Sequence, residues 1–126
     1  MKLLLISVLA IISVSGVAQA EPATGGEIGY PRGSIGYDAL MAGDNDRAIS
    51  QIMANERVNR NDPARLINLG QAYARTGRTA QAVELFNAAI ESRDELDLIL
   101  ADGRVMNSKE AAKQALTKLH MRMAAR

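Results

Sequence analysis

A register that repeats every 34 residues is the strongest constraint on the fold of this chain. Four sets of small or apolar residues recur at that spacing: Ile35-Gly36 and Leu69-Gly70, Gly43 and Gly77, Ala48 and Ala82, and Ile52 and Phe86. A fixed period of this length is typical of two-helix repeats, in which each unit buries its apolar face against the next because it cannot do so alone. The register therefore predicts an all-α fold with two helix-turn-helix units.

The first twenty residues predict a secretory signal peptide. Lys2 precedes an apolar run from Leu3 to about Val17, which closes on the small-x-small sequence Ala18-Gln19-Ala20. A transmembrane anchor is the alternative, but the run is shorter than the roughly 20 apolar residues that span a bilayer. We therefore expect residues 1–20 to be cleaved and the exported chain from Glu21 onward to carry no stable membrane anchor.

The exported chain is expected to be electrically neutral. The full sequence has 15 basic and 14 acidic residues, and the loss of Lys2 leaves 14 of each. This balance argues against nucleic-acid binding, which needs a basic surface, and against a polybasic membrane patch. The chain has no cysteine, so its stability in an oxidising compartment must come from packing without disulfides.

Residues 21–34 are expected to form a linker or an ordered N-terminal arm. The segment contains four glycines and two prolines and has little apolar periodicity. If the arm is ordered, Ile28, Tyr30 and Pro31 are expected to lie across the first helix. The remaining residues, 35–126, are expected to form one helical domain.

Start and stop signals divide the first part of this domain into four helices. Asp44-Asn45-Asp46 offers an N-cap for the second helix, and Asp62 is the predicted N-cap of the third. Pro63 suits a first helical position because the amide hydrogen that it lacks would have no partner there. Gly43 and Gly77 can adopt the left-handed conformation that ends a helix. The expected helices cover residues 35–42, about 45–58, 63–76 and about 79–92.

The 34-residue register is lost after Arg93. Leu96, Leu98 and Leu100 alternate with other residues before Asp102-Gly103, a dipeptide typical of tight turns, and this pattern predicts a small β-hairpin. A further helical turn is the alternative, because a helical spacing also accounts for several of these apolar residues.

A last helix is expected from Lys109 to about Met123, with Ser108 as its N-cap. Repeat stacks usually need three or more units, so this helix is expected to cover the end that two units leave open. The hairpin and the capping helix together account for residues 97–126.

The second repeat resembles a tetratricopeptide repeat over residues 63–96. The positions that carry the resemblance are Leu66, Leu69, Gly70, Tyr73, Gly77, Ala82, Phe86 and Ala89. The resemblance implies that the small residues let two helices approach closely and that Tyr73 and Phe86 fill the space between units. Residues 29–62 resemble a diverged copy, with Ala39 in the place of Tyr73 and Asn55 in the place of Ala89.

The resemblance implies a protein-interaction module. In this family the first helix of each unit lines a concave groove, which implies that an exposed face is formed by Ile67, Asn68, Gln71, Ala74 and Arg75. Its amides and its guanidinium group suit a peptide or a protein tail. A solvated face without a partner is the alternative. Residues 98–112 also resemble the tail of small exported tetratricopeptide proteins of Gram-negative bacteria, which implies a periplasmic location.

Few residues are suited to catalysis or to metal binding. His120 is the one histidine and no cysteine can join it as a metal ligand. No serine lies in a Gly-x-Ser-x-Gly turn, and the acidic clusters at residues 44–46 and 94–97 lack a calcium-binding loop. We therefore expect no enzymatic activity, no metal and no cofactor.

Two functions remain. The leading hypothesis is an exported adaptor or scaffold that binds an unidentified protein or peptide. The alternative is a structural homo-oligomer that assembles through the hairpin edge at residues 96–106 or through the open end of the repeats.

Overall fold

The computed structural model describes residues 32–126, so the predicted signal peptide and most of the predicted N-terminal arm lie outside the described residues. The described part is mainly helical with one small antiparallel sheet, which confirms the mainly helical prediction and the hairpin. In chain order the elements are α1 (Tyr37–Met41), α2 (Asn45–Ala54), α3 (Pro63–Arg75), α4 (Thr79–Glu91), β1 (Asp97–Ile99), β2 (Val105–Asn107) and α5 (Ser108–Ala124).

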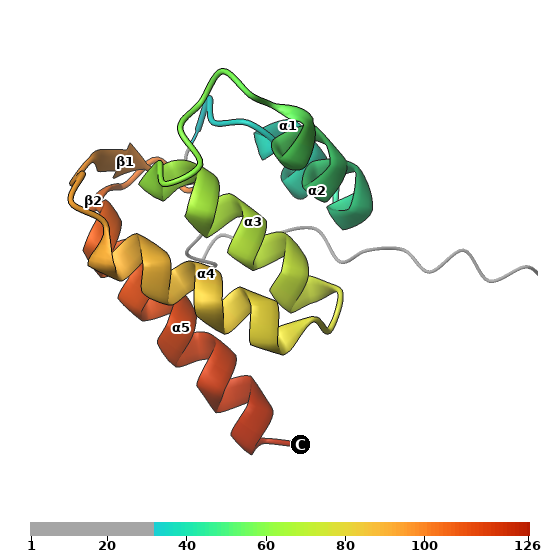
Figure 1. Ribbon diagram of the computed structural model, residues 1–126. Coiled ribbons are helices and arrows are strands. Elements are labelled where there is room, and N and C mark those ends of the chain that lie inside the picture. The colour runs from blue at the N-terminus through green and yellow to red at the C-terminus, as the bar shows by residue number, and fades with distance from the viewer. Residues whose placement is uncertain (1–31) are drawn as a thin grey trace, which may run out of the picture.

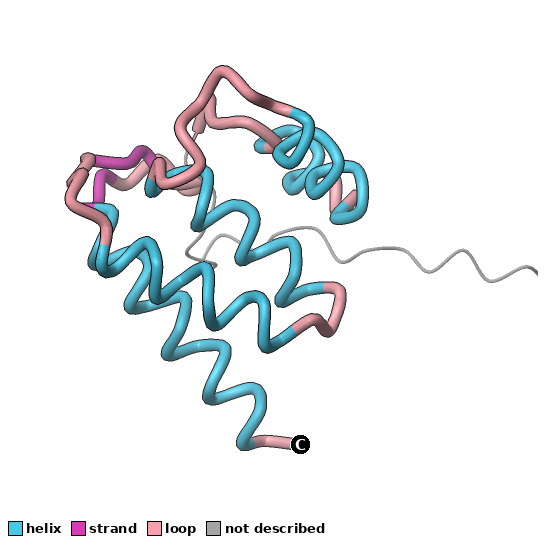
Figure 2. Tube along the Cα trace, in the orientation of Figure 1, coloured by secondary structure: helices cyan, strands magenta, loops and turns pink. Residues whose placement is uncertain are grey.

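Helix α3 is the centre of the fold. It contacts each of the other four helices, while α4 also packs along α5 and α1 packs on α2. Figure 1 shows α3, α4 and α5 running side by side, with α1 and α2 together on the far side of α3 from α5. The hairpin lies at the end where α3 begins, and the C-terminus of α5 lies at the opposite end (Figure 2).

The same close contact between a glycine and an apolar side chain occurs twice, 34 residues apart. A Cβ atom added to Gly36 would lie 2.8 Å from Cδ1 of Ile52, and one added to Gly70 would lie 2.6 Å from Cε1 of Phe86. Both distances are shorter than a van der Waals contact allows. Each glycine therefore lets the helix that follows or contains it approach its neighbour closely.

The helix ends also recur at this spacing. Gly43 and Gly77 have φ angles of +74° and +77°, each directly after a helix C-cap. The Gly43 amide donates to the Leu40 carbonyl and the Asp44 amide to the Ala39 carbonyl, and the same two bonds recur 34 residues later at Gly77 and Arg78. This pattern is a Schellman motif, in which a left-handed glycine lets the following amides bond to the last carbonyls of the helix.

The predicted N-cap of the third helix is confirmed, and within the predicted segment Asp44-Asn45-Asp46 the N-cap of the second helix is Asp44. The Asp44 carboxylate accepts from the Arg47 amide at 3.1 Å and that of Asp62 from the Arg65 amide at 2.9 Å. Helix α2 ends at Ala54, before the predicted boundary, because Asn55 turns to an extended conformation.

The predicted cap of the last helix is wrong. Asn107 caps α5 by accepting from the Lys109 amide at 2.9 Å. Ser108 is buried and instead pairs with Leu96: its hydroxyl accepts from the Leu96 amide at 3.1 Å, and its own amide donates to the Leu96 carbonyl at 2.8 Å. Ser108 thus joins the start of α5 to the approach to β1.

The hairpin covers α3 with its inner face. Leu98 and Leu100 are buried, and they share one core cluster with Leu66 and Ile67 of α3 and Ala112 of α5. The connection has three residues between the hydrogen-bonded Leu100 and Arg104, and Gly103 closes it with a φ of +87°. This is the loop of a type I turn followed by a left-handed residue, one residue longer than the tightest hairpins.

We expect Gly70→Leu to lower the free energy of unfolding by about 1–3 kcal/mol, because the ring of Phe86 leaves no room for a side chain. Urea denaturation followed by circular dichroism measures the change. Phe86→Ala supplies the matched background, since it opens the space, and the cost of Gly70→Leu should be smaller there. Equal costs in both backgrounds would show that the ring is not what excludes the side chain.

An ion pair at the base of the hairpin makes a pH-dependent prediction. The Lys109 ammonium lies 2.7 Å from the Glu95 carboxylate, and its hydrogen bond and charge lower the pKa of Glu95. A lowered pKa means that the pair stabilises the fold above the ordinary pKa of Glu95 and ceases to do so as the pH falls through the lower value. In an NMR titration, Lys109→Met should raise the Glu95 midpoint. An unchanged midpoint would mean that the pair does not form.

Candidate functional site

The face of α3 that was predicted to bind a partner is largely covered by the protein itself. Ile67, Asn68 and Gln71 are buried, so the prediction of an exposed face is wrong for these three residues. Ala74 and Arg75 are half-buried.

Contacts of Ile67, Asn68 and Arg75 show what covers this face. The Asn68 amide group donates to the Ser34 hydroxyl and, at 3.2 Å, to the Ile35 carbonyl. Arg75 donates to the Leu40 carbonyl at 3.3 Å. Ile67 packs under the inner face of the hairpin. The segment before α1, α1 itself and the hairpin therefore occupy the surface on which a partner was expected.

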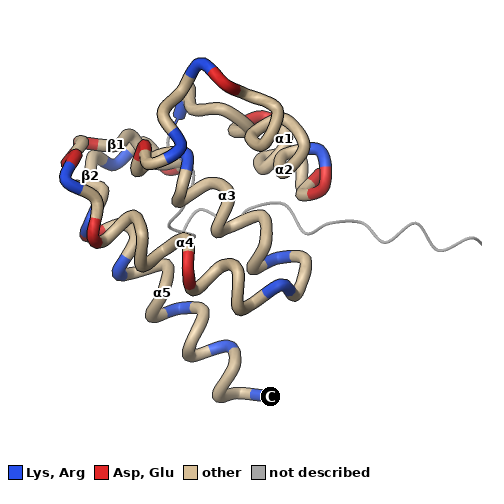
Figure 3. The backbone as a smooth tube through the Cα atoms, viewed as in Figure 1, with Lys and Arg blue, Asp and Glu red and all other residues tan. Residues whose placement is uncertain are grey.

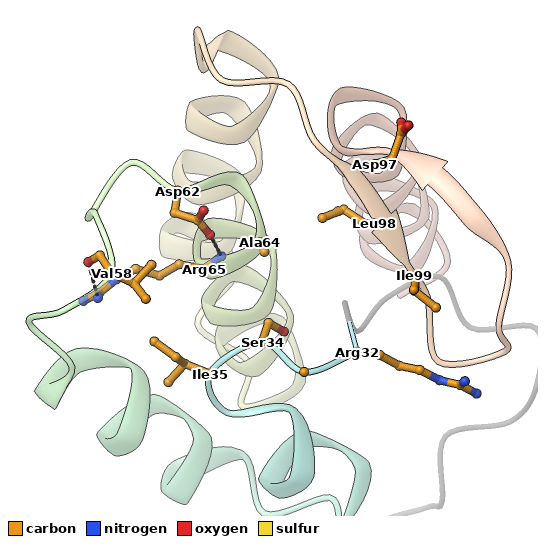
Figure 4. A pocket seen from close by; sticks show the side chains of 11 residues that line it. Arg32, Ser34, Ile35, Val58, Asp62, Ala64, Arg65, Asp97, Leu98 and Ile99 are labelled. Atoms are coloured by element: carbon orange, nitrogen blue, oxygen red, sulfur yellow. Dashed lines mark hydrogen bonds between the residues drawn. The ribbon is translucent and has the colours of Figure 1, made fainter.

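A cleft of about 350 Å³ opens beside this covered face. Figure 4 shows β1 on one side of it and the start of α3 on the other, with the segment from Arg32 to Ile35 between them. The residues that line it are Arg32, Gly33, Ser34, Ile35, Val58, Asp62, Ala64, Arg65, Asp97, Leu98 and Ile99.

Arg65 holds the helical wall of the cleft in place. Its side chain is buried, and its guanidinium donates to the Asn55 carbonyl at 2.6 Å and to the Val58 carbonyl at 3.3 Å. These bonds tie the loop between α2 and α3 to the first turn of α3. Asp62 is also engaged, since its carboxylate caps α3. Both residues position the wall through bonds that they already make.

The opposite wall is a strand edge. In the described residues β1 has a single strand neighbour, β2, with Leu98 opposite Met106 and Ile99 opposite Val105. Across the hairpin, the Leu100 amide donates a hydrogen bond to the Arg104 carbonyl, and the Ser108 amide donates one to the Leu96 carbonyl. Because backbone groups alternate in direction along an antiparallel strand, the amides and carbonyls of Asp97 and Ile99 face away from β2.

One hydrogen bond already uses this edge. The Arg32 amide donates to the Ile99 carbonyl at 2.6 Å, and the Arg32 guanidinium donates to the Ala101 carbonyl at 3.3 Å. The chain at Arg32 thus lies beside the C-terminal end of β1 and marks one end of the cleft. From Ile99 back to Asp97, the outer edge of β1 continues along the wall of the cleft.

The side chains around the edge combine acidic and apolar groups. Asp97 is exposed on the outer face of β1, and Ile99 is 48% exposed on the same face. Across the cleft lie the aliphatic side chains of Ile35 and Val58 (Figure 4). Such a site offers backbone hydrogen bonds, apolar contact and one carboxylate to an extended segment.

The residues of the predicted repeat signature lie in the core or at the end of a helix. Leu66, Leu69, Gly70, Ala82, Phe86 and Ala89 are buried, Tyr73 is half-buried, and Gly77 ends α3. His120 is exposed near the end of α5. Across residues 32–126 no group of three or more histidine, cysteine, aspartate or glutamate side chains is placed to hold a metal ion. Over the same range no helix is both long and apolar enough to cross a membrane.

Comparison with protein-family models, with curated proteins and with solved structures finds no match to this chain. Its function must therefore be argued from its own residues.

We expect Arg65→Met to lower the free energy of unfolding by about 2–3 kcal/mol, because two hydrogen bonds from a charged donor to backbone carbonyls are lost. The matched control is Arg57→Met, because Arg57 is exposed in the loop between α2 and α3 that Arg65 holds. This variant should change the free energy of unfolding by less than about 0.5 kcal/mol. Urea denaturation compares the two variants. Equal stabilities would contradict the role assigned to Arg65.

Proposed function

We propose that this protein is an exported adaptor that binds an extended segment of another protein along the outer edge of β1. The observation that carries the proposal is the edge itself: Asp97 and Ile99 line a cleft with their backbone groups facing away from β2, and the Ile99 carbonyl already accepts a hydrogen bond from the Arg32 amide. Addition of a strand to an exposed sheet edge is a common mode of peptide recognition. No catalytic step is part of the proposal.

The helical part serves as the support for this edge. We interpret α1–α2 and α3–α4 as two tetratricopeptide-like units and α5 as their cap. The recurrence of the Gly36–Ile52 contact at Gly70–Phe86 supports this interpretation. In this arrangement the hairpin covers the face of α3 on which a partner was expected, and we place the binding surface on the edge of the sheet instead.

The chemistry of the cleft defines the partner segment. An extended chain is suited to donate to and accept from the backbone of Asp97. Its alternate side chains would face Ile35 and Val58 on one side and the Asp97 carboxylate on the other. We expect a segment with an aliphatic residue next to a lysine or arginine, and without proline where it pairs.

The location of this activity follows from the predicted signal peptide. Residues 1–20 direct export in this proposal, and the adaptor acts in the periplasm of a Gram-negative bacterium. The partner is therefore a protein of the cell envelope.

Asp97→Pro tests the edge directly. Asp97 is the first residue of β1 and its amide faces away from β2, so proline removes a donor from the outer edge while the bonds to β2 remain. Peptides are first selected from a displayed library of random 12-residue sequences on the chain from Glu21 to Arg126. Isothermal titration calorimetry then compares the variants, and we expect Asp97→Pro to weaken the selected peptide by about tenfold.

Asp97→Asn is the matched control, since it keeps the amide and removes only the charge. It should weaken peptides that carry a cation and leave neutral ones unchanged. Peptides that bind Asp97→Pro as tightly as the unmodified chain would contradict strand addition.

Self-association through the hairpin is the second candidate function. Ile99 and Val105 lie opposite each other on the outer face, 48% and 66% exposed, and they form an apolar pair that a second copy could cover. Light scattering at tens of micromolar should then give twice the chain mass, and Val105→Lys should restore a monomer. A monomer mass for the unmodified chain would exclude this candidate.

A further inference from the structure

The balanced charge of the chain hides a strong local excess of cations at one end. Residues 111–126 contain Lys113, Lys118, Arg122 and Arg126 and no acidic residue. Figure 3 shows these basic positions along α5, and further basic positions at the turn between α3 and α4. Arg75 and Arg78 occupy that turn.

Core packing joins the two basic segments. Ala115 and Leu119 of α5 share a cluster with Ala82 and Phe86 of α4, and Tyr73 and Ala74 of α3 pack against it. The last turns of α5 therefore lie at the same end of the molecule as Arg75 and Arg78. The acidic residues near this end are Asp46, 3.9 Å from Arg78, and Glu84 on α4. Glu91 of α4 and Glu110 of α5 lie toward the hairpin end, where the charge of Lys113 acts on Glu95. Five cations at this end, Arg75, Arg78, Lys118, Arg122 and Arg126, thus outnumber two acids.

Helix capping accounts for only part of this excess. Cations in the last turn of a helix interact favourably with its dipole, which explains Arg122. Lys118 lies further from the C-terminus of α5, where the effect of the dipole has decayed. The helix dipole therefore does not account for every cation of this segment.

Apolar side chains are exposed among the cations. Every residue from His120 to Arg126 is exposed, and Met121 and Met123 are 65% and 49% accessible. Figure 1 shows this end of α5 projecting from the other helices. Flexible thioether side chains next to cations are suited to a boundary between charged groups and hydrocarbon.

We propose that this projecting end of α5, together with Arg75 and Arg78, binds the surface of an anionic phospholipid membrane. A convex end can rest on a lipid surface, where cations meet phosphate groups and methionines enter the acyl boundary. An acidic peptide would not provide an apolar environment for the exposed methionines, and it would lose conformational entropy on binding. The attraction is reversible and peripheral, and each cation near an anionic surface raises partitioning roughly fivefold.

Cosedimentation with vesicles tests this proposal. The chain from Glu21, which retains every residue described here, is mixed with vesicles of phosphatidylglycerol and phosphatidylcholine in equal parts or of phosphatidylcholine alone. We expect binding to the first and not to the second at 50 mM NaCl, and loss of binding at 500 mM, because salt at that concentration screens exposed charges. The double variant Arg122→Glu/Arg126→Glu should lower the partition coefficient by roughly 25-fold or more.

The matched control is Arg57→Glu/Arg93→Glu. It changes the net charge by the same amount, but both residues are exposed at the end of the molecule where α3 begins and α4 ends. It should bind vesicles within about threefold of the unmodified chain. Circular dichroism should give the same helix content for both double variants.

Three results would overturn the proposal. The first is equal binding to both vesicle compositions, and the second is an equal loss of binding in the two double variants. The third is full displacement from vesicles by poly-glutamate at matched ionic strength, which would assign this end to an acidic protein. Met121→Gln/Met123→Gln gives an independent readout, because it keeps every charge and should still weaken binding several-fold.

Discussion

The close approach of α3 to α4 at Gly70 sets the packing of the central helices. The ring of Phe86 occupies the space where a side chain at residue 70 would lie, and it also contacts the cluster that includes Ala115 and Leu119 of α5. One ring therefore fixes the distance between α3 and α4 and the position of the capping helix. Because α3 touches every other helix, a shift here would move each wall of the cleft.

The hairpin changes what the helical framework can do. Its inner leucines cover the face of α3 for which the sequence predicted a partner, while the backbone groups on its outer edge face away from β2. The proposed binding mode therefore depends on a segment outside the 34-residue register. The helices form a rigid framework, and Arg65 fixes the loop between α2 and α3 on the other side of the cleft.

Local signals in the sequence predicted most of the elements. Asp62-Pro63 and the paired glycines act within a few residues of themselves, so the boundaries of α3 and the ends of α1 and α3 could be derived without tertiary contacts. The alternating leucines likewise indicated the hairpin. The cap of α5 was misplaced because Asn107 and Ser108 are adjacent and both suited to capping. Only the partner of Ser108, Leu96, decides between them.

The candidate site could not be predicted in the same way. The burial of Asn68 depends on Ser34 and Ile35, in the segment before α1 and more than thirty residues away in the chain. Arg65 carries no signal in the sequence, since a buried arginine on the first turn of a helix has the same pattern as an exposed one. The outward direction of Asp97 and Ile99 agrees with the alternation of the leucines, but that alternation does not reveal the cleft beside them.

In the proposed function the outer edge of β1 is the docking surface for the partner segment. The exchange rates of individual backbone amides, measured by NMR with and without a bound peptide, test this directly. We expect the Asp97 and Ile99 amides to gain protection on binding, while those of Leu98 and Leu100, which face β2, stay unchanged. Protection that appears instead on helical surfaces, with no change at Asp97 or Ile99, would contradict it.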